Sequence, residues 1–256
     1  MKSVAIAIVL ASTAVRADSD LSMPDLFALD KQQHWTELLD SADRVKPAGR
    51  TADWTRLVTA AATRVVQQVD RASTSGLREA SALVDVVPRA ERKYTFLVGD
   101  AAYLGAKAMA LQSLVAACGH QTDYGCGALA ASLADGVTRF PPGTAKAIAI
   151  LVGADQSPAE ATHFWALAVD DDKDACKESA LARSIVGALR VSSVPRQIAD
   201  AQRAASACYA VIEDALVDEL VKTADDAKHR PLYLDNACPV LKTHGTMTIA
   251  KRKKCP

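Results

Sequence analysis

Apolar residues recur at steps of three and four along most of the chain, and this spacing predicts α-helices. The clearest example predicts one continuous helix over residues 89–118. Its apolar stripe consists of Leu97, Ala101, Leu104, Ala108, Leu111, Val115 and Cys118. A similar stripe follows Pro195, which is expected to begin another long helix. Glycine and proline separate about nine such segments, so the chain is expected to be all-α.

Two segments near the start of the chain share one apolar pattern. Trp35-x-x-Leu38-Leu39-x-x-Ala42 recurs as Trp54-x-x-Leu57-Val58-x-x-Ala61. Each pattern places its apolar residues on one helical face. We therefore expect an antiparallel helical hairpin in which both indoles are packing anchors. The alternatives are that the shared tryptophan is a coincidence, or that the two indoles stack on a ligand.

Later helix boundaries are marked by proline and acidic residues. Ser157-Pro158-Ala159-Glu160 has the form of a helix start, with a serine cap, a proline in the first position and a glutamate three residues after the cap. Helices of this kind, joined by short connections, pack either as an α-solenoid of stacked hairpins or as an orthogonal helical bundle. The sequence therefore predicts an all-α fold that is either an α-solenoid or an orthogonal bundle.

Residues 164–220 combine proline-led helix starts, acidic turns and paired stripes of Ala, Leu, Ile and Val. In these features the second half of the chain resembles HEAT-like helical repeats. Such repeats usually act as binding scaffolds. The resemblance therefore implies that the protein binds a partner, and it implies no particular chemistry.

The beginning of the sequence has the pattern of an export signal. Residues 1–17 contain one early cation, Lys2, then a short apolar run, and then small residues at Val15 and Ala17. The apolar run is too short to span a bilayer. We expect a signal peptide over 1–17, a helical repeat-like domain over 18–230, and an irregular C-terminal tail over 231–256. The mature protein is predicted to be secreted or periplasmic.

Composition narrows the possible partners. Half of the residues are apolar, 23% are charged and 5% are aromatic, which is typical of a globular chain with closely packed helices. Cations and anions are equal in number, and removal of Lys2 and Arg16 with the signal would leave an excess of two anions. This balance gives no indication of nucleic-acid binding. No later apolar segment is expected to span a membrane.

In an oxidising compartment the six cysteines are candidates for disulfides. Six cysteines allow fifteen connectivities. Sequential pairing is favoured because consecutive helices are usually neighbours, while buried reduced thiols are the alternative. The predicted pairs are Cys118 with Cys126, Cys176 with Cys208, and Cys238 with Cys255.

Metal and cofactor motifs are incomplete in this chain. Cys118-x-His120 with Cys126 lacks the paired spacing and fourth ligand of a structural zinc site. The acidic run at 170–174 lacks the glycine and the terminal acid of a calcium loop. The glycines at 125–127 follow a predicted helix and not a strand, so the dinucleotide motif lacks its context. We expect no cofactor and no metal.

One acid offers an enzymatic alternative. Glu178-Ser179 resembles the glutamate and serine of exported lysozyme-like transglycosylases, in which an apolar pocket keeps the acid protonated. The glycine-rich and aromatic segments of that family are missing from residues 180–192, and a carboxylate in a first helical turn also favours the helix dipole. The prediction is a non-enzymatic exported scaffold of the cell envelope with a protein partner. The alternative is a glycan-cleaving enzyme that uses Glu178 as its acid.

Overall fold

The computed structural model describes residues 20–119, 125–155, 158–244 and 255. The signal peptide predicted over 1–17 lies outside the described residues. Within them the secondary structure is helical, and β-pairing is limited to one isolated bridge between Leu21 and Val45.

The described residues form more helices than the nine or so that the pattern predicts. The helix predicted over 89–118 and the long helix predicted after Pro195 are each divided, and residues Met23–Lys31 and Arg230–His244 form helices that were not predicted. Short 3₁₀-helices lie between some of them: η1 (Ala42–Arg44), η2 (Pro47–Gly49), η3 (Thr95–Gly99) and η4 (Lys173–Lys177). The α-helices are α1 (Met23–Lys31), α2 (Trp35–Ser41), α3 (Ala52–Ser75), α4 (Leu77–Val84), α5 (Val86–Lys93), α6 (Ala101–Cys118), α7 (Cys126–Ala134), α8 (Thr144–Asp155), α9 (Thr162–Asp171), α10 (Ser179–Val191), α11 (Pro195–Ala207), α12 (Tyr209–Lys222) and α13 (Arg230–His244).

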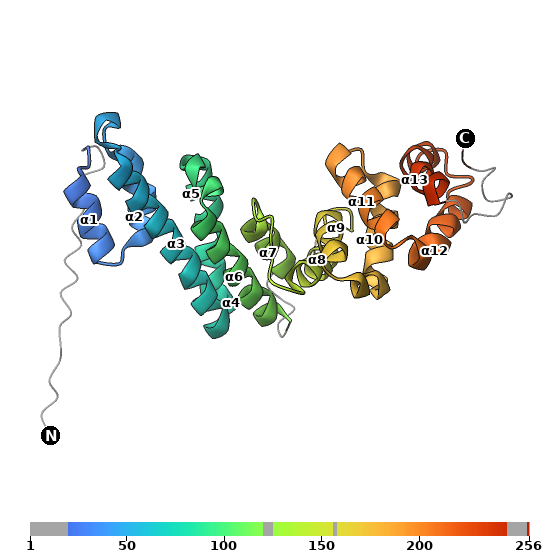
Figure 1. Cartoon of the computed structure of the whole chain (residues 1–256), viewed down its shortest axis with the longest axis horizontal. Helices are drawn as coiled ribbons and strands as arrows, with labels where there is room; N and C mark the ends of the chain where they lie inside the picture. Colours follow the sequence, from blue (N-terminus) through green and yellow to red (C-terminus); the bar gives the residue numbers. More distant parts are fainter. Residues whose placement is uncertain (1–19, 120–124, 156–157, 245–254, 256) are drawn as a thin grey trace, which may run out of the picture.

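The helices follow one another along the long axis of the molecule in chain order (Figure 1). α1 lies at one end and α13 at the other. The extensive contacts join helices that are at most three positions apart in this order, as α3 with α6 and α10 with α13. The apolar core therefore extends along the row of helices.

The predicted hairpin near the start consists of α2 and α3, which pack together. Trp35 and Trp54 are both buried, as expected for packing anchors. The Trp54 indole donates to the Ala42 carbonyl at 2.9 Å and packs edge-on against the rings of Tyr94 and Phe96. Its aromatic neighbours thus come from the α5–η3 region, forty residues further along the chain.

The prediction of one helix over 89–118 is wrong. α5 ends at Lys93, η3 follows, and Asp100 caps α6 by accepting a hydrogen bond from the Tyr103 amide at 2.8 Å. The buried face of α6 is also rotated from the predicted stripe, since Ala101 is exposed whereas Tyr103 and Lys107 are buried. Lys107 can lie on this buried face because it is paired with Glu91.

One described helix, α6, is long and apolar enough to cross a membrane, contrary to the expectation that no segment after the signal would be. Core helices of water-soluble proteins pass the same criterion. α6 packs along α3 and carries a lysine that is paired within the protein. These contacts are those of a core helix.

The segment expected to be an irregular tail begins with a helix. α13 has Pro231 near its start, where the missing amide hydrogen is tolerated, and it continues through Pro239. The Tyr233 ring is buried against α12, and its hydroxyl donates to the Leu216 carbonyl at 2.8 Å. Packing on α12 and α10 therefore outweighs the local cost of the second proline.

Candidate functional site

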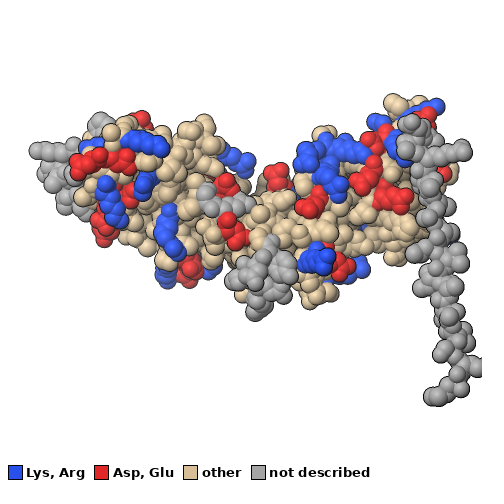
Figure 2. All heavy atoms as spheres, turned by 180° about the vertical axis from the view of Figure 1, so that it is seen from behind, with Lys and Arg blue, Asp and Glu red and all other residues tan. Residues whose placement is uncertain are grey.

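A pocket of about 380 Å³ lies where α7, α9 and α11 meet. Figure 2 shows the surface hollowed near the middle of the long axis, where Figure 1 places α7 to α9. The residues after α7 form one wall, and the first turns of α9 and α11 form the other. The pocket is thus built from segments up to seventy residues apart in the chain.

The interior of the pocket is apolar. The Phe164 ring lies edge-on to the Phe140 ring, with 6.4 Å between their centroids, so its position is fixed by aromatic packing. Small alanines on α7 leave the space that the pocket occupies. The apolar lining residues are Ala131, Ala134, Val137, Val152, Phe164 and Leu167.

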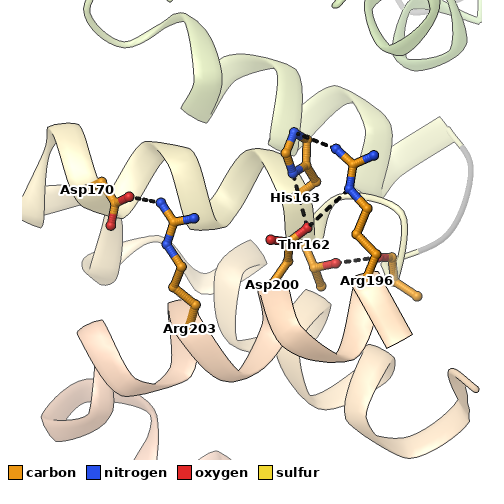
Figure 3. Close-up of polar contacts among 7 residues, drawn as sticks. Thr162, His163, Asp170, Arg196, Asp200 and Arg203 are labelled. Atoms are coloured by element: carbon orange, nitrogen blue, oxygen red, sulfur yellow. Dashed lines mark hydrogen bonds and ion pairs between the residues drawn. The ribbon is translucent and has the colours of Figure 1, made fainter. Parts of the chain in front are cut away.

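One side of the pocket carries a chain of three polar side chains (Figure 3). His163 Nδ1 lies 3.1 Å from Asp200 Oδ2, and His163 Nε2 lies 3.3 Å from Arg196 Nη2. Because a guanidinium can only donate, Nε2 is the acceptor, and Nδ1 carries the proton and donates to Asp200. Asp200 is 15% exposed and His163 34%, so the pair is partly shielded from water.

Both ring nitrogens of the pocket histidine are engaged by neighbouring side chains. A general base needs a ring nitrogen free to accept a proton, but Arg196 occupies that nitrogen. Among the described lining residues the hydroxyls belong to Thr138 and Thr162. Thr162 is fully buried and donates to the Ala159 carbonyl at 2.7 Å (Figure 3). Thr138 is thus the exposed hydroxyl among the described lining residues.

An ion pair and a hydrogen bond hold the two helices of this wall together. Arg203 on α11 pairs with Asp170 at the end of α9, and His163 and Asp200 join the two helices at the pocket (Figure 3). Arg203 is favourably placed because a cation near a helix C-terminus interacts with the helix dipole. The wall is thus fixed at two points along the α9–α11 contact.

A buried lysine fixes the opposite wall. Lys107 Nζ on α6 donates to Glu91 Oε1 on α5 and to the Asp135 carbonyl that follows α7, each at 2.6 Å. The Tyr103 hydroxyl donates to the same Glu91 oxygen at 3.0 Å. Burial, and secondly the negative charge of Glu91, raise the pKa of Tyr103. This network connects α5 and α6 to the segment that lines the pocket.

The structure places Glu178 outside this pocket. It is the residue before α10, one position earlier than the first-turn position that we predicted, and its carboxylate pairs with Lys146 at 3.3 Å. The side chain is 39% exposed. A half-exposed, ion-paired carboxylate differs from the acid of lysozyme-like enzymes, which lies in an apolar pocket.

The cysteines lie in three pairs at disulfide distance, with Cα–Cα separations of 5.9, 5.3 and 5.5 Å. The pairs are Cys118–Cys126, Cys176–Cys208 and Cys238–Cys255, consistent with sequential pairing. His120 lies outside the described residues. Within the described ranges, no group of three or more His, Cys, Asp or Glu could hold a metal ion.

The sequence did not indicate the pocket residues. Glu160 was expected in a capping box with Ser157, but α9 begins only at Thr162, and Glu160 lines the pocket. Ser157 itself lies outside the described residues. His163 was one of five scattered histidines, and Asp200 lies 37 residues further along the chain. The spacing of residues within a segment does not predict a contact between two residues so far apart in the sequence.

Comparisons of the chain with known protein families, curated proteins and solved structures find no match.

Proposed function

We propose that this protein is an exported helical scaffold of the cell envelope that binds a protein partner without catalysing a reaction. The observation that carries the proposal is the pocket between α7, α9 and α11, with its apolar interior and charged rim. Apolar pockets with a few convergent polar groups are typical of binding sites.

The arrangement of the helices supports the solenoid interpretation over the closed bundle. In an array of stacked hairpins each helix contacts only its near neighbours, and the array presents extended surfaces to partners. The extensive contacts described above have this short range, and the two ends of the row lie far apart (Figure 1). The HEAT-like pattern of residues 164–220 agrees with such an array.

Export is supported by two independent features. Three cysteine pairs at disulfide distance indicate an oxidising environment, since the cytosol keeps thiols reduced. The sequence pattern of residues 1–17 is that of a cleaved signal. Together they favour a secreted or periplasmic protein.

The proposal is tested by affinity purification of the tagged full chain from its native envelope. Thr138 is an exposed lining residue, so Thr138→Trp fills the pocket without disturbing the core. The matched control is Thr243→Trp, an exposed position in the last turn of α13. We expect one protein to be retained in stoichiometric amount by the wild type and the control, and to be lost with Thr138→Trp. Equal retention by all three forms, or no stoichiometric partner, would contradict the proposal.

The enzymatic alternative has its own test. Peptidoglycan is incubated with the wild type and with Glu178→Gln, which keeps the size of the side chain and removes its charge. We expect no glycan cleavage by either form. Cleavage by the wild type that is abolished in Glu178→Gln would replace the scaffold with a glycan-cleaving enzyme.

A further inference from the structure

We infer that the pocket binds a basic side chain, arginine or lysine, that is flanked by an apolar residue in the partner protein. This inference rests on the proposed function and specifies the chemistry of the partner. It is carried by the charge of the pocket rim, by the apolar interior and by an exposed valine beside the opening.

The rim of the pocket has more negative than positive charge. Its carboxylates belong to Asp135, Glu160 and Asp200, while Arg196 is the one Lys or Arg among the described lining residues. Asp200 is already engaged by His163 and Arg196. Asp135 and Glu160 are exposed, and neither forms an ion pair with any described residue. Two carboxylates at the opening are therefore available to a cation.

The interior fits the stem of a long basic side chain. Lysine and arginine carry an apolar chain of three or four methylene groups below the charged head, and this chain prefers an apolar surface. Phe164, Leu167 and Val137 provide that surface below the rim. A volume of about 380 Å³ accommodates one or two side chains and excludes a whole helix. The occupant is therefore a side chain presented by a partner.

One exposed apolar side chain lies beside the pocket opening. Val98 is 47% exposed, and its Cγ1 lies 4.0 Å from the position that a Cβ on the lining residue Gly136 would occupy. An exposed valine beside the opening is suited to an apolar neighbour of the basic residue. The expected recognition element is thus a basic residue next to a leucine-like residue.

Other occupants fit the pocket less well. An acidic segment would face Asp135 and Glu160 with like charge, which disfavours binding. A purely apolar ligand would cover the two carboxylates without pairing them, and the lost hydration would oppose its binding. A basic side chain pairs its charge with the rim carboxylates and packs its methylene groups against the apolar interior.

The inference is tested with three blocked pentapeptides, Gly-Leu-X-Leu-Gly, in which X is Arg, Gln or Glu. Binding is followed by amide chemical shifts of the ¹⁵N-labelled mature protein at low and at high salt. We expect the Arg peptide to shift the amides of Gly136, Phe164 and Leu167 and to bind at least about fivefold more tightly than the Gln peptide. The Glu peptide should bind most weakly, and salt should reduce the difference.

Variants of the rim carboxylates test whether they cause the preference for the Arg peptide. The double variant Asp135→Asn, Glu160→Gln should lower the affinity for the Arg peptide by about three- to tenfold and leave the affinity for the Gln peptide unchanged. Asp218 is an exposed acid on α12, and its replacement by Asn should change the affinity for neither peptide. All three positions are exposed, so folding is not at risk.

The outcomes separate this inference from the proposed function. Equal binding of the Arg and Gln peptides, or an unchanged Arg preference in the double variant, overturns the inference. If a Thr138-sensitive partner is still retained in that case, the scaffold proposal stands. Selective Arg binding without any retained partner supports the pocket chemistry and contradicts the scaffold proposal.

Discussion

At the scale of single residues, Lys107 has the greatest structural consequence. A lysine is seldom fully buried unless it is paired, and Lys107 is paired with Glu91 inside the core. Its second hydrogen bond holds the carbonyl of Asp135, so the same side chain stabilises α5, α6 and the pocket wall. The apolar pattern predicted a different buried face for α6, because pattern analysis treats every lysine as a surface residue.

Replacing Lys107 with Met keeps the length of the side chain and leaves the Glu91 carboxylate buried without its partner. Loss of one member of a buried pair typically costs about 3–5 kcal/mol. We expect the free energy of unfolding in urea to fall by about this amount. The double variant Lys107→Met, Glu91→Gln removes the stranded charge and should recover part of the loss. A double variant at least as unstable as the single one would contradict the role of the ion pair.

Three buried phenols make stability sensitive to alkaline pH. Burial raises the pKa of Tyr94, Tyr103 and Tyr233 in the folded protein above the ordinary value of about 10. The unfolded chain therefore loses these protons first. Stability is complete below about pH 10 and decreases as the pH rises through the raised values, by up to about 1.4 kcal/mol per pH unit for each phenol.

Urea unfolding between pH 8 and pH 11.5 measures this loss. Tyr233→Phe removes one of the three phenols, so its stability should decrease about one third less steeply above pH 10 than that of the wild type. Identical slopes for both proteins would show that the Tyr233 phenol ionises equally in the folded and unfolded states.

At the scale of elements, the contact between α7 and α8 depends on one glycine. A Cβ on Gly127 would lie 2.5 Å from the Leu151 carbonyl oxygen and 2.8 Å from the Val152 Cα, both of which are backbone atoms of α8. Backbone atoms cannot move aside as a flexible side chain can. Gly127 thus sets the approach of the helix that carries the pocket wall.

Gly127→Ala should destabilise the protein by about 1–3 kcal/mol through overpacking. Gly105→Ala is the matched control, because Gly105 lies on the exposed side of α6 with no atom within 4 Å of its Cβ position. The control should be stabilised by about 0.5–1 kcal/mol through helix propensity. Thermal unfolding of both variants measures the difference. An equal increase in the melting temperature of both variants would contradict the close packing of α7 on α8.

The helical class could be predicted because the three-and-four spacing is a local property of the sequence. The interruption between α5 and α6 could not be predicted, because the Trp54 indole and the buried Lys107 network that accompany it involve contacts far apart in sequence. The pocket could not be predicted for the same reason: His163 and Asp200 meet only when α9 and α11 pack. Sequential cysteine pairing could be predicted because segments close in sequence usually lie close in space, as the ends of α6 and α7 do at Cys118 and Cys126.

At the scale of the whole molecule, the disulfides join nearby segments only. Their sequence separations are 8, 32 and 17 residues, so none of them connects the two ends of the row. Each stabilises a local pair of segments and leaves the row open. Loop-closure entropy predicts a larger effect for the longer loop.

Peptide mapping of the non-reduced protein should recover the three sequential pairs. Replacing Cys176 and Cys208 together with Ala should cost about 3–4 kcal/mol, and replacing Cys118 and Cys126 together should cost about 2–3 kcal/mol. Free thiols in the mapped peptides, or a link between Cys118 and Cys238, would contradict the pairing.

The scaffold proposal depends on an open row of helices, and small-angle X-ray scattering of the mature protein tests this most directly. A compact domain of this length has a radius of gyration of about 18 Å. An open row of helices should give a clearly larger radius of gyration and a distance distribution with a long tail. A radius near 18 Å with a symmetric distribution would instead indicate a closed bundle and would contradict the scaffold proposal.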